Sequence, residues 1–289
     1  MLIWCVFHGR FGNNLFQYAA ARAAASRAKH ATLLMDFSRL PAGRSASEIA
    51  ELDLVRLGLP GLILPSFINR LSQKMFRRMA CELCLLPVVT DADIAVVSSG
   101  LGSSSLLSGY FQDVSILKGQ EEAFRTMVRD RLDGIFGRTQ RRCATSVAVH
   151  VRRGDYLNEP LRQVCDHRYF SEAISEFRAK LPSPIFFVFS DDPSWCSEHL
   201  TGRDIEIVRP GRKPDSLLDF AQMTSCDHQI ISNSSFSWWA GWLNPNPGKL
   251  VIGPDVWLRD LADSLAGKEF PGFMPLSRFR SGDWPDFQK

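Results

Sequence analysis

The chain has 289 residues, 45% of them hydrophobic, and a formal net charge of +3. This length allows one large domain or two of ordinary size, and so small a net charge gives no support to nucleic-acid binding through a general basic field. The apolar start, Met1 to Phe7, is too short for a secretory signal or a membrane span. We therefore expect a cytoplasmic protein.

The first residues predict the beginning of a parallel α/β sheet. The apolar run Leu2–Phe7 shows no helical period and is typical of a buried strand. A glycine turn follows, and then an alanine-rich helix, Leu15–Lys29, that Asn13 or Asn14 is able to cap. A second strand, Ala31–Asp36, ends in a carboxylate. Strand, turn, helix and strand in this order indicate a βαβ unit.

The middle of the chain is less regular. A helix is predicted over Ile68–Leu86, where four basic residues stand among apolar ones. Such a helix touches a membrane surface or an acidic partner, or it presents an ordinary solvated face, and we favour the solvated face. Peripheral contact with the inner face of a membrane stays open as the alternative. A loop over Val96–Ser105, a strand over Leu106–Asp113 and a helix over Glu121–Leu132 follow.

A polar link ending at residue 142 predicts a domain boundary, with domains over 1–142 and 143–289. The second half alternates strands and helices more clearly than the first, as a doubly wound domain does. Its predicted strands are Ser146–Val151, Ile185–Phe189, Ile205–Val208, Gln229–Ser232 and Leu250–Ile252. Its predicted helices are Arg168–Leu181, a helix from Asp215 or Ser216 to Cys226, and Trp238–Leu243.

The seven cysteines are scattered along the chain. Cys81 and Cys84 have the spacing of a redox or zinc pair, but no second pair stands at zinc-ribbon distance. We therefore favour structural cysteines. The sequence also has no P-loop, no Gly-x-Gly-x-x-Gly, no His-Glu-x-x-His and no Gly-x-Ser-x-Gly motif.

Three polar clusters in the second half follow predicted strands, where the ligand crevice of an open α/β sheet lies. They are Arg152, Arg153 and Asp155, then Asp191 and Asp192, then Asn233, Ser234 and Ser235. Guanidinium groups suit phosphate, the start of a helix favours an anion, and a carboxylate accepts bonds from a ribose or a guanine. The clusters together predict a nucleotide-diphosphate site.

Each cluster also has a simpler interpretation. The arginines and Asp155 form an ion pair that closes a turn, the Asp191–Asp192 pair caps a turn, and Ser234 and Ser235 cap the tryptophan-rich helix. We favour one shared site over three separate caps. The aspartate pair resembles a metal-binding pair, but no other clear ligand stands beside it, so no metal is predicted.

Four stretches resemble glycosyltransferase family 11, the α-1,2-fucosyltransferases. They are Gly9–Tyr18, Gly109–Gln112, His150–Tyr156 and Asp219–Asn244, and the third contains His-Val-Arg-Arg-Gly-Asp-Tyr. The resemblance implies a GT-B-like α/β fold, in which two Rossmann-like domains face each other across a cleft that holds GDP-fucose. The N-terminal domain would serve mainly the acceptor, and the C-terminal domain would bind the GDP-sugar. No metal would be required.

The resemblance also implies residue roles. Arg152 would stabilise the departing diphosphate, with Asn13 and Asp155 as further catalytic residues, while Arg153 would pair with Asp155 and support the loop. The residues expected to bind the GDP-sugar are Arg10, His150, Arg153, Tyr156, Asp191, Asn233, Ser234, Ser235 and Phe236. Residues after Trp257 match nothing in the family pattern.

The expected reaction is inverting transfer of L-fucose from GDP-β-L-fucose to the 2-hydroxyl of a terminal galactose. The expected acceptor is a glycan, lipid-linked in a bacterial member. The alternatives are a protein O-fucosyltransferase and a non-catalytic sugar-nucleotide-binding protein. The general base stays open among His8, Asp113, Asp155 and a phosphate oxygen of the donor, and we favour a turn role for His8.

Overall fold

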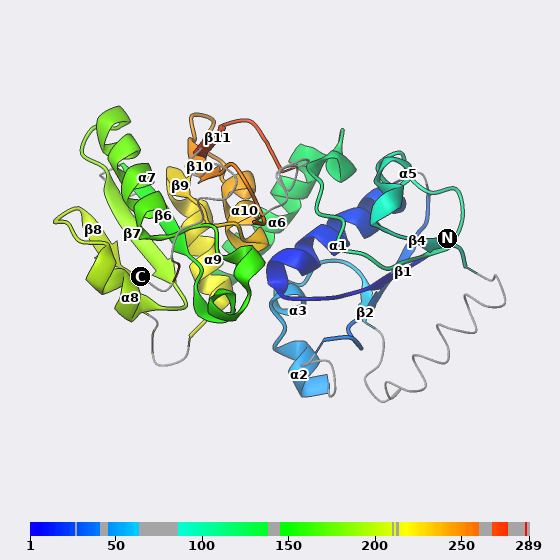
Figure 1. The fold of residues 1–289 in the computed structure, drawn as a ribbon. Helices are drawn as coiled ribbons and strands as arrows, with labels where there is room; N and C mark the ends of the chain where they lie inside the picture. Colours follow the sequence, from blue (N-terminus) through cyan, green and yellow to red (C-terminus); the bar gives the residue numbers. More distant parts are fainter. Residues whose placement is uncertain are drawn as a thin grey trace. The chain divides into compact units, whose positions relative to one another are not determined.

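A computed structural model of the chain describes residues 1–26, 28–40, 46–63, 86–137, 145–209, 211, 214–259, 268–276 and 287. The chain forms two compact units, Met1–Ile135 and Phe136–Lys289. Each unit is built on a parallel sheet with helices (Figure 1). The predicted boundary after residue 142, the helix predicted over Ile68–Leu86, apart from its last residue, and the Cys81–Cys84 pair lie outside the described residues.

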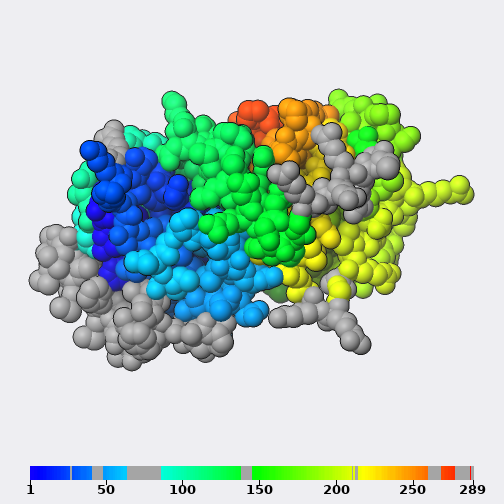
Figure 2. Space-filling view, turned by 180° about the vertical axis from the view of Figure 1, so that it is seen from behind, coloured from blue at the N-terminus to red at the C-terminus, as the bar shows by residue number. Residues whose placement is uncertain are grey.

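The sheet of the first unit runs β3-β2-β1-β5-β4, and its neighbouring strands are parallel. Its strands are β1 (Leu2–Val6), β2 (Thr32–Asp36), β3 (Leu62–Ile63), β4 (Val88–Val89) and β5 (Ser105–Leu107). Its helices are α1 (Phe11–Ala24), α2 (Ala46–Ala50), α3 (Asp53–Arg56), α5 (Ile94–Ser98) and α6 (Glu121–Phe136), whose last residue belongs to the second unit. Seen from behind, α2 and α3, in light blue, lie on the surface (Figure 2).

Helix α1 is almost entirely buried because its alanines let it lie close to its neighbours. It begins four residues earlier than predicted, since the amide of Asn14 already bonds to the carbonyl of Arg10 at 3.0 Å. The cap residue is therefore Arg10, and the prediction of Asn13 or Asn14 as the cap was wrong. The helix ends at Ala24, before the predicted Lys29.

Two further predictions in this unit were wrong in part. The segment predicted as a loop over Val96–Ser105 begins with the end of α5. The strand predicted over Leu106–Asp113 ends at Leu107, because the backbone turns sharply after Ser108 and Phe111 takes a φ of +52°.

The sheet of the second unit runs β11-β10-β9-β6-β7-β8 and is also parallel. Its strands are β6 (Ser146–Val151), β7 (Ile185–Ser190), β8 (Ile205–Ile207), β9 (His228–Ile230), β10 (Val251–Pro254) and β11 (Phe273–Leu276). Its helices are α7 (His167–Lys180), α8 (Pro193–His199), α9 (Ser216–Ser225) and α10 (Ser235–Leu243). The five predicted strands are present, and α8 and β11 are additional.

The alternation of β6 determines what faces each side of this sheet. Its odd-numbered residues, Val147, Val149 and Val151, belong to a buried cluster with side chains of α7 and α8. The even-numbered His150 points the other way, where its ring lies 5.4 Å from that of Phe236 at the start of α10. The strand therefore carries a polar side chain toward α10.

The search for a membrane-crossing helix, made over the described residues, found none that is long and apolar enough. The four described cysteines, Cys5, Cys165, Cys196 and Cys226, are buried. Burial raises the pKa of the Cys196 thiol to about 11, so it stays protonated at neutral pH. These four cysteines behave as small core residues, as predicted.

Candidate functional site

Arg152 is the first residue after the central strand β6, and it contacts both flanking strand ends. Its amide donates to the hydroxyl of Ser232, after β9, at 3.1 Å. Its guanidinium pairs with Asp191, after β7, with Nη1 2.5 Å from Oδ2, and also with Asp155 in the following turn. Since β6 lies between β7 and β9, the sheet order brings the predicted clusters to one edge.

The two carboxylates balance and hold the Arg152 guanidinium. Its side chain is 17% exposed, while those of Asp155 and Asp191 are 36% and 26% exposed. The Arg152–Asp155 pair spans three residues and closes the turn. The ion pair that the simpler interpretation of this cluster predicted is therefore present. The Arg152 guanidinium is therefore held in place by two carboxylates that are partly exposed to solvent.

Arg153 has a different set of partners. Its Nε lies 3.2 Å from Asp192, and its Nη1 donates to the carbonyl of Phe287 at 2.9 Å. Its guanidinium lies over the ring of Trp195, 4.1 Å from the centroid, and near the Phe287 ring. The expected Arg153–Asp155 pair was therefore wrong. Consecutive side chains at a strand end point to opposite sides, so Arg152 takes Asp155.

The two aspartates after β7 differ in the same way. Asp191 accepts from the Arg153 amide at 2.9 Å and pairs with Arg152. Asp192 caps helix α8 by accepting from the amide of Trp195 at 3.1 Å, which is the turn role that the simpler interpretation gave it. Of these two aspartates, Asp191 is the one that pairs with the Arg152 guanidinium.

His150 carries an unsatisfied polar atom at this edge. It is 7% exposed, and within the described residues its Nδ1 has no hydrogen-bond partner. Burial, with a smaller contribution from the positive charge of Arg152, lowers the pKa of His150 to about 3. The imidazole is therefore neutral at physiological pH. A buried polar atom without a partner is uncommon and calls for an explanation.

The residues at the start of α10 have different contacts. Asn233 holds the surrounding loops, because its amide donates to the carbonyls of Arg162 and Trp257 and its carbonyl accepts from the Tyr156 hydroxyl. Ser234 occupies the cap position of α10, but among the described residues its side chain forms no capping hydrogen bond. Phe236 packs on His150 and on Phe220 of α9.

Ser232 is a functional candidate that the motif reasoning missed. Its hydroxyl donates to the carbonyl of His150 at 2.6 Å and accepts from the amide of Arg152. This one hydroxyl therefore ties the ends of β6 and β9 together on both sides of Val151. The sequence signal that could have identified Ser232 was its position directly before the Asn233–Ser235 cluster.

The first unit places its predicted residues at the start of α1. Arg10 is exposed at the cap position, and Asn13 accepts a hydrogen bond from Gln112 Nε2 at 2.7 Å. Gly9 has a φ of +71°, and a Cβ there would collide with the Asn13 side chain. Glycine is thus required at this turn by both backbone and space.

The candidate bases lie in different surroundings. Asp113 accepts from the amide of Ser115 at 2.8 Å and caps the 3-10 turn Val114–Leu117. Asp155 is paired with Arg152, and the His8 ring lies 6.0 Å from that of Tyr110. Over the described residues, no group of three or more His, Cys, Asp or Glu side chains is placed to hold a metal ion.

Two parallel α/β units, together with the structural match that follows, give a GT-B fold, which the expectation from the sequence named correctly. The chain superimposes on fucosyltransferase NodZ from Bradyrhizobium with a TM-score of 0.51 and 16% identity, over 83% of this chain and 91% of that chain. Residues 88–259 match the model of Glycosyl transferase family 11. The chain belongs to this family.

Curated relatives extend over most of the chain. An alpha-1,2-colitosyltransferase of Escherichia coli is 27% identical over 86% of this chain and 90% of its own length. The human galactoside alpha-(1,2)-fucosyltransferase 1 is 29% identical over 83% of this chain and 65% of its own length. The protein is thus a glycosyltransferase of family 11, and both of these relatives are named for α-1,2 transfer.

Proposed function

We propose that the protein transfers L-fucose from GDP-β-L-fucose to the 2-hydroxyl of a terminal galactose, with inversion at the sugar. Membership of family 11 supports glycosyl transfer, and the human relative supports fucose as donor sugar and galactoside as acceptor. In this proposal the residues after β6, β7 and β9 bind the GDP-sugar. The first unit serves the acceptor. We assign the two domains to residues 1–142 and 143–289.

The observation that carries the proposal is His150 Nδ1, which has no hydrogen-bond partner among the described residues and belongs to an imidazole whose pKa is lowered by burial and by the charge of Arg152. A neutral imidazole donates from one ring nitrogen and accepts at the other, so it is able to bind a phosphate oxygen or a ribose hydroxyl. A ligand group at Nδ1 removes the cost of burying this atom without a partner. The open capping hydroxyl of Ser234 lies at the start of α10, where an anion is favoured.

Arg152 provides the electrostatic part of the mechanism. As the glycosidic bond breaks, negative charge grows on the departing GDP while the sugar gains oxocarbenium character. A fixed guanidinium stabilises this charge with little reorganisation. Asp155 and Asp191 hold the guanidinium in place, and both are partly exposed. Water therefore solvates the two carboxylates when the diphosphate replaces them as the partner of Arg152.

The same donor site supports a second donor sugar. The Escherichia coli relative that covers 86% of this chain is named as a colitosyltransferase. In this proposal Arg152 and His150 bind the nucleotide part of the donor, so they do not distinguish donor sugars. A colitosyl donor is therefore the alternative to GDP-fucose, with the same α-1,2 linkage.

The decisive experiment is to incubate the purified protein with GDP-fucose and lactose, with and without a metal chelator. NMR of the product then gives the linkage and the anomeric configuration. An α-1,2-fucosylated galactose, formed at the same rate with the chelator, is the expected result. Transfer from a colitosyl donor alone supports the alternative donor. Transfer to a protein hydroxyl alone, or GDP binding with no transfer from either donor, contradicts the proposal.

A further inference from the structure

The segment Gly109–Gln112 of the first unit lies beside the end of β1 and is not used by the donor site. It follows β5, which pairs directly with β1. His8 follows β1, and its ring lies 6.0 Å from the ring of Tyr110. Both aromatic side chains therefore stand at the carboxyl edge of this sheet, where open α/β folds bind their ligands.

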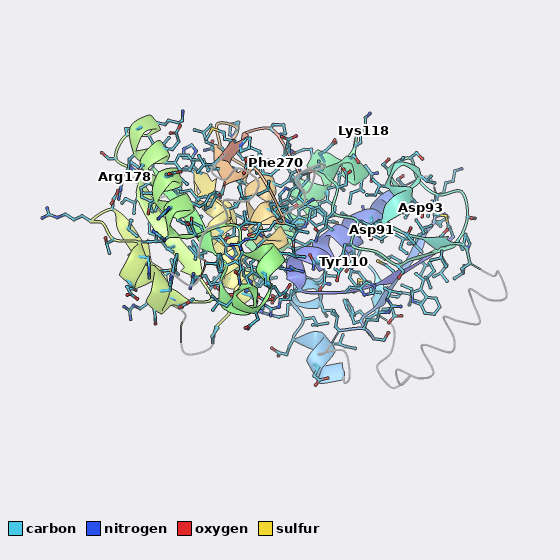
Figure 3. All side chains as sticks on the ribbon, in the orientation of Figure 1. Asp91, Asp93, Tyr110, Lys118, Arg178 and Phe270 are labelled. Carbon is cyan, nitrogen blue, oxygen red and sulfur yellow. The ribbon has the colours of Figure 1, made fainter. Side chains whose placement is uncertain are left out.

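The backbone of this segment is held in an unfavourable conformation. Phe111 has a φ of +52° with its side chain fully buried, a left-handed backbone that costs a phenylalanine free energy. The Asp91 carboxylate compensates by accepting from the amides of Tyr110, at 2.9 Å, and Phe111. Gly109 makes room for it, since a Cβ there would lie 2.7 Å from Asp91 Oδ2. Figure 3 shows Asp91 and Tyr110 side by side.

The consequence is that the backbone of Tyr110 is held while its side chain stays accessible. Its side chain is 47% exposed although both amides of the turn are tied to Asp91. Gln17 joins this turn to the neighbouring one, because it donates to the carbonyl of Gly109 at 2.9 Å and accepts from the amide of His8 at 3.0 Å. The Gln112–Asn13 hydrogen bond, at 2.7 Å, adds a polar pair beside them.

We propose that Tyr110 binds the acceptor glycan by stacking its ring on the apolar face of a sugar, and that Asp91 positions it. This proposal rests on the proposed function and names the residue that meets its acceptor. A tyrosine has only two side-chain torsions, so it presents a large apolar face at small entropic cost, and the adjacent imidazole and amides suit sugar hydroxyls. Backbone strain that the surroundings fully determine is common at binding sites.

The first test separates acceptor binding from donor chemistry. Tyr110→Ala is compared with Tyr110→Phe, which keeps the ring, and with Val96→Ala, which shortens another exposed side chain of the same unit. The readouts are the KM for lactose, the KM for GDP-fucose, and hydrolysis of GDP-fucose without lactose. We expect the KM for lactose to rise roughly tenfold or more in Tyr110→Ala. The two donor readouts should stay at wild-type values, and Tyr110→Phe should behave almost like wild type.

Two results would overturn the proposal: a lactose KM in Tyr110→Ala no higher than in Val96→Ala, or an equal loss of donor hydrolysis. Failure of the proposed function looks different, because the wild-type protein itself then transfers no sugar to lactose. In that event saturation-transfer NMR with lactose decides, since binding that Tyr110→Ala abolishes supports the acceptor site and binding that it leaves intact overturns it.

The second test addresses the positioning role of Asp91. Asp91→Ala removes the acceptor of the Tyr110 and Phe111 amides, whereas Asp91→Asn keeps one carbonyl oxygen for them. We expect the KM for lactose to rise in Asp91→Ala and to recover in part in Asp91→Asn, with donor hydrolysis unchanged in both. A variant pair with identical lactose KM values, or a fall in donor hydrolysis, contradicts the positioning role.

Discussion

Arg152 and Arg153 are neighbours in the sequence with opposite surroundings. Arg152 ends in a fork shared by two partly exposed carboxylates, while Arg153 is 5% exposed between the ring of Trp195 and Phe287. A partly exposed guanidinium with exchangeable partners is suited to a ligand. A buried one with fixed partners is suited to holding structure.

The first prediction follows from this difference. Arg152→Ala should lower kcat for transfer by roughly 100- to 1000-fold, because a fixed donor to the leaving group is lost. Arg152→Lys should recover only part of it, since an ammonium lacks the planar fork. Steady-state kinetics with GDP-fucose and lactose measure both. Near-normal turnover of Arg152→Ala, with an unchanged thermal midpoint, would show that another group stabilises the departing GDP.

The second prediction concerns His150 and pH. The folded protein holds its pKa near 3, below the ordinary value of 6.5, so the unfolded chain binds more protons between these pH values. Stability should therefore fall as the pH drops from 6.5 toward 3, with a contribution of up to about 1.4 kcal/mol per pH unit. His150→Gln should remove this contribution. Urea unfolding at several pH values measures it, and equal slopes in both proteins would contradict it.

At the scale of elements, β6 and β7 follow their predicted bounds closely because local apolar runs set them, whereas β9 ends two residues before its prediction and α10 begins three residues before its own. No local sequence pattern predicted that β5 ends at Leu107. Tyr110 and Phe111 depend on Asp91, about twenty residues earlier, for the acceptor of their amides. Sequence patterns describe elements well and describe poorly the turns that a distant side chain holds.

The third prediction concerns the turn between β1 and α1. Gly9→Ala should abolish most transfer activity, because it adds left-handed strain and displaces the Asn13 side chain. Gly119→Ala is the matched control, since Gly119 has a φ of +78° but no heavy atom within 4 Å of an added Cβ. The control should lose only about 1–2 kcal/mol of stability. Equal activities in the two variants would show that the Asn13 placement does not matter.

At the scale of the whole molecule, the sequence predicted two α/β domains and the convergence of three polar clusters on one sheet edge. The rule that the carboxyl ends of parallel strands share a crevice was sufficient for this. Which carboxylate pairs with which arginine was not predictable, because Arg152 and Arg153 are adjacent and have the same side chain. The role of Phe287 was also hidden, because no local pattern links it to Arg153, 134 positions earlier.

The fourth prediction tests that long-range contact. Phe287 is 2% exposed and covers the Arg153 guanidinium. Phe287→Ala should lower the free energy of unfolding by roughly 3–5 kcal/mol, as removal of a buried phenylalanine does. It should also weaken GDP binding, because Arg153, next to Arg152, loses the Phe287 ring over its guanidinium and keeps, from residue 287, only the hydrogen bond to the main-chain carbonyl. Calorimetry of GDP binding and urea unfolding check both effects. Leu218→Ala, at a 37% exposed position, is the control, and identical behaviour of the two variants would refute the link.

The stacking of Trp195 under Arg153 should give the protein an optical reporter of the proposed donor site. Trp238, Trp239 and Trp242 are buried against one another in α10. The Trp195 indole instead lies 4.1 Å from a guanidinium that adjoins the Arg152 loop. Its fluorescence should change when GDP binds and Arg152 exchanges its carboxylates for the diphosphate. Donor binding should then be observable in unlabelled protein, in real time, without any transfer taking place.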